Sequence, residues 1–69
     1  MNWIIECYLD SQGLWVTSHH SEMYDGEWLT MNFDKMIDIL SCDSIRAADM
    51  HYRGRNTTTG EVIPAEIFV

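Results

Sequence analysis

Histidines, cysteines and carboxylates are the side chains in this sequence with the greatest capacity for chemistry. His19, His20 and Glu22 form the densest group that resembles a metal site. Adjacent histidines in an extended segment point in opposite directions, unlike histidines four residues apart on a helix. We therefore expect this segment to be a solvated loop, with no bound metal and no cofactor.

Cys7 and Cys42 could supply a thiol nucleophile or a single disulfide. Both lie among apolar neighbours, where burial keeps a thiol protonated and unreactive. The chain begins Met-Asn-Trp-Ile-Ile, without the basic region of a signal peptide. We therefore expect a cytoplasmic protein whose two buried thiols are reduced, although the sequence leaves open whether they pair.

The sequence contains no phosphate-binding glycine loop and no catalytic triad motif. Eleven acids in sixty-nine residues make some close carboxylate pairs inevitable, so such a pair is no evidence for acid–base catalysis. A domain of this length also has little room for an enclosed pocket. We expect no enzymatic activity and no catalytic residues.

Arg53, Gly54 and Arg55 follow Tyr52, a combination that resembles a very small nucleic-acid-binding patch. The formal net charge of −7 opposes contact with a phosphate backbone. We expect the arginines to pair with nearby acids or with an acidic patch on a second copy, and we expect no direct nucleic-acid binding.

The negative charge is concentrated in the first two-thirds of the chain. Residues 1–45 hold eight acids and one lysine, whereas residues 46–69 hold three acids and three arginines. An acidic surface attracts basic surfaces of other proteins, although acidity also serves solubility alone. Acids can steer the encounter while tryptophan or tyrosine provides the buried contact. The residues that we predict to contact a partner are Asp25, Glu27, Trp28, Asp34 and Asp38.

Alternating apolar residues predict two β-hairpins. Residues 3–9 and 14–18 or 19 form the first, around the turn at Asp10–Gly13. Residues 45–55 and 61–69 form the second, around a turn that ends at Gly60. Pro64 cannot donate to a β-ladder, so it indicates an edge strand or a bulge.

One helix is expected over residues 31–41, where Phe33, Met36, Ile37 and Leu40 form an apolar stripe. Thr30 or Asn32 is the expected N-cap. Residues 18–27 are expected to form a loop. The result is a single α+β domain over residues 1–69, a four-stranded antiparallel sheet with one helix on one face. No apolar run reaches the roughly 18 residues of a membrane span.

This acidic, tryptophan-rich chain resembles the small proteins that bacteriophages use against host machinery, including inhibitors of restriction enzymes and anti-CRISPR proteins. The resemblance covers size, charge and composition, and carries over no functional residue. It implies a non-enzymatic inhibitor that occupies a basic surface of a bacterial nucleic-acid-handling or defence protein in the host cytoplasm. The alternative is a small homodimeric structural or assembly protein without an inhibitory role.

Overall fold

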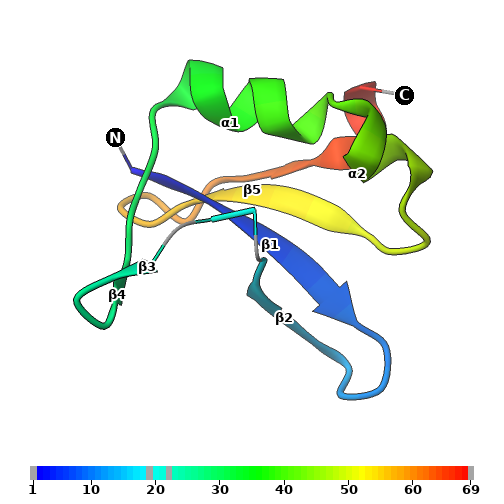
Figure 1. The fold of residues 1–69 in the computed structure, drawn as a ribbon, viewed down its shortest axis with the longest axis horizontal. Helices are drawn as coiled ribbons and strands as arrows, with labels where there is room; N and C mark the ends of the chain where they lie inside the picture. Colours follow the sequence, from blue (N-terminus) through cyan, green and yellow to red (C-terminus); the bar gives the residue numbers. More distant parts are fainter. Residues whose placement is uncertain (1, 19, 22, 69) are drawn as a thin grey trace.

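The computed structural model describes residues 2–18, 20–21 and 23–68. Its centre is a four-stranded antiparallel sheet in the order β2-β1-β5-β6. The strands are β1 (Trp3–Leu9), β2 (Leu14–Thr17), β5 (Tyr52–Asn56) and β6 (Val62–Pro64). Helix α1 (Phe33–Leu40) lies across one face of this sheet (Figure 1). The predicted α+β class, the two hairpins and the single main helix are confirmed.

Both predicted hairpin turns form where glycine permits a positive φ. Gly13 closes the β1–β2 turn at φ 66°, and its amide donates to the Leu9 carbonyl over 2.7 Å. Gly60 ends the β5–β6 turn at φ 79°. Within that turn the Asn56 side chain accepts from two backbone amides, those of Thr58 and Thr59. These local bonds fix the turn and therefore the register of the strands.

The strand predicted over residues 45–55 is wrong in its first half. The structure has a short helix, α2 (Asp43–Ala47), and strand β5 begins only at Tyr52. Cys42 is the N-cap of α2, and Asp43 in the first turn suits the helix dipole. Ile45 is buried in the core from this helix. The apolar residues of this segment fit one helical turn as well as an alternating strand.

The strand predicted over residues 61–69 is too long. Strand β6 ends at Pro64, and a 3₁₀ helix, η1 (Ala65–Phe68), follows it. Ala65 is buried, whereas Ile67 is 62% exposed. Strand β6 is the edge strand that Pro64 indicates. Val69, the last residue of the predicted strand, lies outside the described residues.

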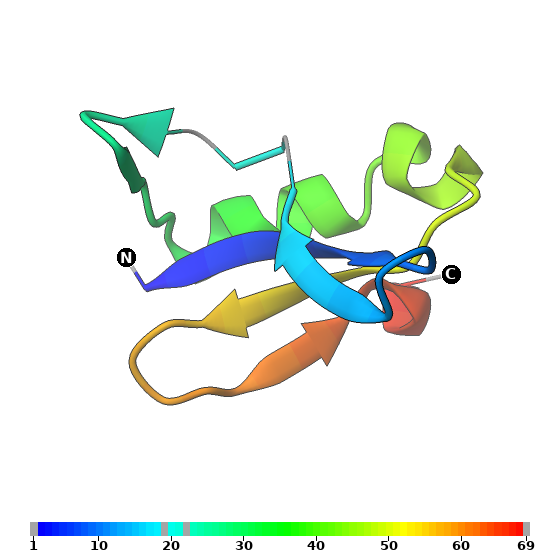
Figure 2. The same ribbon diagram turned by 90° about the horizontal axis from the view of Figure 1, so that it is seen from below.

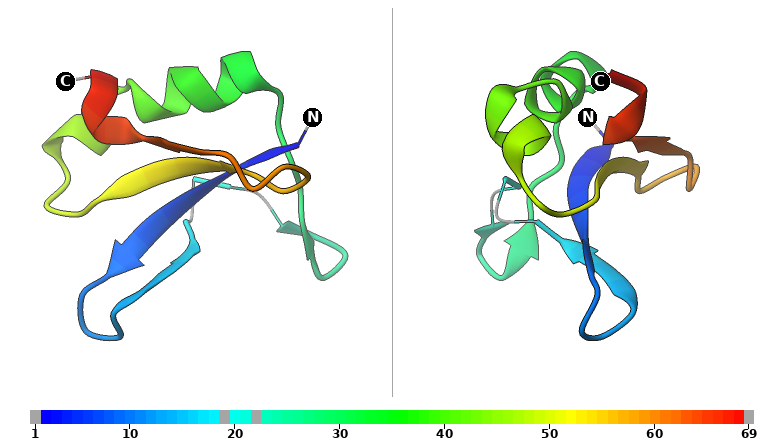
Figure 3. Two further views of the ribbon diagram at one scale, coloured as in Figure 1. Left: turned by 180° about the vertical axis from the view of Figure 1, so that it is seen from behind. Right: turned by 90° about the vertical axis from the view of Figure 1, so that its right-hand side faces the viewer.

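Residues 18–27, predicted as a loop, contain part of a small hairpin of two strands, β3 (Met23–Tyr24) and β4 (Glu27–Trp28). Asp25 and Gly26 form its turn, both with positive φ, at 52° and 80°. An Asp-Gly pair is typical of tight hairpin turns. Figures 1 and 3 show this hairpin at the opposite edge of the molecule from α1.

The core lies between α1 and the sheet. Ile5 and Met36 are fully buried at its centre, and Leu40 packs beside them. Asn32 caps the helix, because its side chain accepts from the Lys35 amide over 2.8 Å. Phe33 is a correction to the predicted stripe: its side chain is 47% exposed.

Candidate protein-binding surface

Acidic side chains cover the surface of the protein. Of the eleven acids, Glu22 lies outside the described residues and Glu6 is buried. The remaining acids are all exposed: Asp10, Asp25, Glu27, Asp34, Asp38, Asp43, Asp49, Glu61 and Glu66. An acidic exterior of this kind favours contact with basic surfaces.

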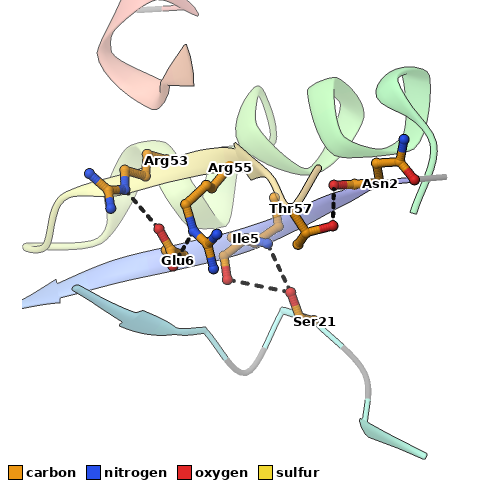
Figure 4. A network of polar contacts seen from close by, with 7 residues as sticks. All are labelled: Asn2, Ile5, Glu6, Ser21, Arg53, Arg55 and Thr57. Carbon is orange, nitrogen blue, oxygen red and sulfur yellow. Dashed lines mark hydrogen bonds and ion pairs between the residues drawn. The ribbon is translucent and has the colours of Figure 1, made fainter. Parts of the chain in front are cut away.

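Glu6 is the exception because it holds two of the four basic residues. Arg53 Nε donates to Glu6 Oε1 over 2.8 Å, and Arg55 Nε donates to Glu6 Oε2 over 2.9 Å (Figure 4). Only 8% of the Glu6 side chain is exposed. Outside this trio the chain has ten acids against two basic residues, a net charge of −8. The predicted pairing of the arginines with a nearby acid is confirmed.

The predicted contact residues fall into two separate groups. Asp25 and Glu27 lie on the β3–β4 hairpin, whereas Asp34 and Asp38 lie one turn apart on α1. Figures 1 and 3 show these two elements at opposite edges of the molecule. Trp28 belongs to β4, and its side chain is outside the described part of the structure. The structure therefore does not bring all five residues together.

Two exposed apolar residues lie in the chain between the two acidic groups. Leu29 follows β4 and is 44% exposed, and Phe33 begins α1 with its ring edge-on to Trp3 at 5.5 Å. We call these acidic and apolar residues together the acidic arm. Its members are Asp25, Glu27, Leu29, Phe33, Asp34 and Asp38. Sequence reasoning missed Leu29 and Phe33 as exposed residues, because it assigned both of them to the apolar interior.

A small groove lies beside the acidic arm. It has a volume of about 150 Å³ and is lined by His20, Leu29, Thr30, Met31 and Lys35. The groove is large enough for part of one side chain and is far from the volume of a typical small-molecule site.

A second, open groove of about 310 Å³ lies at the other end of the sheet. Its lining residues are Asp10, Arg46, Ala48, Asp49, Met50, His51 and Glu66. His51 Nδ1 and Glu66 Oε1 are 2.7 Å apart. The hydrogen bond with Glu66 raises the pKa of His51, and the same bond lowers the pKa of Glu66. This pair links the start of β5 to η1.

The residues of the predicted histidine loop lie partly outside the structure. His19 and Glu22 are outside the described residues, while His20 Nδ1 lies 3.0 Å from Ser18 Oγ. The His20 ring also lies edge-on to Tyr52 at 5.4 Å. The described residues contain no cluster of three or more histidine, cysteine or acidic side chains that could hold a metal ion.

Cys7 and Cys42 are both free thiols. Cys7 is buried as predicted, and burial raises the pKa of its thiol. Cys42 is a correction, because it is only half-buried at the N-cap of α2. Its Sγ lies 3.0 Å from Ser44 Oγ, and this hydrogen bond lowers the pKa of the thiol. The two cysteines therefore differ in environment and in ionisation.

Among the described residues, no helix is both long enough and apolar enough to cross a membrane. Comparison with known proteins found no matching family model, no similar curated protein and no similar solved structure.

Proposed function

We propose that the protein is a non-enzymatic binding module that inhibits a bacterial nucleic-acid-handling or defence protein by occupying a basic surface of that protein. The proposed partner is a host protein in the bacterial cytoplasm, as for the phage inhibitors that the chain resembles. The observation that carries the proposal is the division of charge. Glu6 holds Arg53 and Arg55, and the other described acids are exposed.

The acidic arm is the proposed contact surface. Its carboxylates would steer a basic partner toward it, because attraction between opposite charges accelerates the encounter. Leu29 and Phe33 would then lose exposed apolar surface, which supplies affinity that salt does not screen. Since the hairpin and α1 lie at opposite edges, a partner that touches both must present a broad basic surface.

A cellular assay tests this function. The protein is expressed in bacteria that carry a restriction or CRISPR system, and transformation by a targeted plasmid is measured. We expect the protein to raise transformation and the double variant Asp34→Lys/Asp38→Lys to abolish that effect. The matched control, Asp49→Lys/Glu61→Lys, makes the same change in charge outside the acidic arm and should retain the effect.

Direct binding supplies the second readout. The partner is captured from a bacterial lysate, identified, purified and titrated with each folded variant. The Asp34→Lys/Asp38→Lys change should weaken its binding at least about tenfold at low salt, and by less at high salt. Equal losses in the control variant would remove the acidic arm as the contact surface. Failure to inhibit the systems tested, together with no salt-sensitive bacterial partner, would overturn the proposed function.

A further inference from the structure

The face of the sheet away from α1 has a different character from the acidic surface. The buried residues of α1, α2 and η1 all belong to one core cluster with Trp3, Ile5 and Cys7 of β1. Successive side chains of a strand point to opposite faces, and directly paired residues share a face. The pairing therefore defines the face away from α1, which we call the open face, as Ile4, Glu6, Tyr8, Trp15, Thr17, Arg53, Arg55, Val62 and Pro64. Ile4 and Glu6 are buried, and the others are partly or fully exposed.

Figure 2 shows this sheet in front of α1, which lies behind it. Among the described residues, no helix is drawn across the near side of the strands. Glu6 is the one acid of the open face, and both of its oxygens already accept from arginine. Tyrosine, tryptophan and arginine are the residues most enriched where proteins bind one another.

The two arginines retain donors for a ligand. Each donates to Glu6 through Nε alone, and the described residues provide no hydrogen-bond partner for the Nη atoms of either. The side chains are 21% exposed at Arg53 and 36% exposed at Arg55. Because one carboxylate holds both guanidinium groups, their orientation is fixed before any ligand arrives. Preorganised arginine forks bind carboxylate and phosphate groups in the same way.

The surroundings of Trp15 favour a carboxylate over a phosphate as the ligand. The Arg53 guanidinium lies over its ring, 4.1 Å from the ring centroid, and Tyr8 contacts it edge-on at 5.3 Å. One face of the ring is thus covered by a cation, whereas nucleic-acid platforms offer free rings to bases. The net charge of −7 further opposes a phosphate backbone. A protein carboxylate fits this face better than a nucleic acid.

We propose that the open face binds a second copy of this chain, with the free donors of Arg53 and Arg55 receiving a carboxylate of that copy. The chain itself carries nine exposed acids among the described residues, so a second copy can supply the ligand. A two-fold axis through the open face would let Arg53 and Arg55 of each copy meet carboxylates of the other.

Self-association also suits the size of the domain. Sixty-nine residues bury a modest core, and small domains are commonly stabilised by oligomerisation. Covering Trp15, Tyr8 and the exposed Val62 would remove aromatic and aliphatic surface from water. The overall negative charge opposes the encounter, so the dimer should form more readily as salt screens that repulsion.

Sedimentation equilibrium over a concentration series up to about 1 mM tests the proposal. A dimer with a dissociation constant above this range would have only a small free energy of association. We expect a monomer–dimer equilibrium in the unmodified protein. Arg55→Gln leaves Arg53 on Glu6 and should weaken dimerisation at least about tenfold. The matched control is Arg46→Gln, on α2, which should leave the equilibrium unchanged. Circular dichroism melts confirm that each variant is folded.

The open face itself gives a second readout, on the residues that the dimer would cover. The Arg53 Nε and Trp15 indole NMR signals should shift with protein concentration in the unmodified protein and should shift much less in folded Arg55→Gln. A second titration adds a short oligothymidylate at low salt and follows the Arg Nε and Trp15 indole NMR signals. A monomer at all concentrations overturns the proposal. So do shifts of these signals by the oligonucleotide in a protein that stays monomeric, which would assign the face to nucleic acid.

Discussion

Met36 of helix α1 packs directly on Gly54 of strand β5. A Cβ built on Gly54 would lie 2.9 Å from Met36 Cγ and would also overlap the sulfur atom. Met36 is fully buried, and it fills the space that a side chain on residue 54 would occupy. The glycine therefore sets how closely the helix approaches the sheet.

Gly54→Ala should lower the free energy of unfolding by about 1–3 kcal/mol, because an overpacked core must shift its neighbours. The double variant Gly54→Ala/Met36→Ala should not show the sum of the two separate losses, since the smaller side chain at 36 makes room for the new methyl group. Chemical denaturation measures both values. Thr58→Ala, at an exposed turn position, is the control and should change stability by less than about 0.5 kcal/mol. Strict additivity would show that the two sites do not share this space.

Glu6→Gln should destabilise the fold by about 1–3 kcal/mol, since it leaves two arginines without their carboxylate. The value is below that of a fully buried ion pair, because Arg53 and Arg55 are partly exposed and solvent screens them. Asp38→Asn makes the same chemical change at an exposed position and should cost much less. If both variants unfolded at the same denaturant concentration, Glu6 would not stabilise the sheet.

The contact between His51 and Glu66 predicts a dependence of stability on pH. The pKa of His51 is raised above 6.5, so its contribution is complete below that value and disappears as pH rises through the folded pKa. The pKa of Glu66 is lowered below 4.5, so its contribution is complete above that value and disappears as pH falls through the folded pKa. The pair therefore stabilises the fold most between these two ordinary values.

An NMR titration of the His51 ring checks this dependence. Glu66→Gln should lower the pKa of His51, because the neutral amide removes the attraction for the imidazolium. Two other acids of the groove, Asp10 and Asp49, also raise this pKa by their charge, and Asp10→Asn should lower it less. An unchanged pKa in Glu66→Gln would mean that the two side chains do not pair in solution.

Cys42 should react with iodoacetamide at least about tenfold faster than Cys7 in the native protein, because only accessible thiols that ionise readily are good nucleophiles. Cys42 is half-buried with a lowered pKa, whereas Cys7 is buried with a raised pKa. Peptide mass spectrometry after timed labelling measures the two rates. In denaturant the rates should converge, and a persistent difference there would show that the fold is not its cause.

Local patterns in the sequence predicted most of the fold. Alternating apolar residues predicted β1, and glycines predicted the turns at Gly13 and Gly60. The helical spacing of apolar residues predicted α1, with Asn32 as one of two expected caps. The failures occurred where one pattern fits two structures. Ile45 suits a strand or a single helical turn, and packing against the core selected the helix.

The acidic surface, like the fold, was only partly predictable from the sequence. Composition alone predicted a strongly negative exterior and placed the excess before residue 46. It did not reveal that Glu6 would be buried, or that the elements carrying Asp25 and Asp34 would lie at opposite edges of the molecule. Spacing along the chain carries little information about distance once the intervening segment turns back on itself.

The sequence by itself determined the strand and turn chemistry, the amphipathic helix and the sign of the surface charge, because each depends on residues close together in the chain. Only the tertiary structure decided that Glu6 holds Arg53 and Arg55, forty-seven and forty-nine residues away. It also decided that Met36 packs on Gly54. These relationships arise from strand order and helix position, which depend on long-range packing.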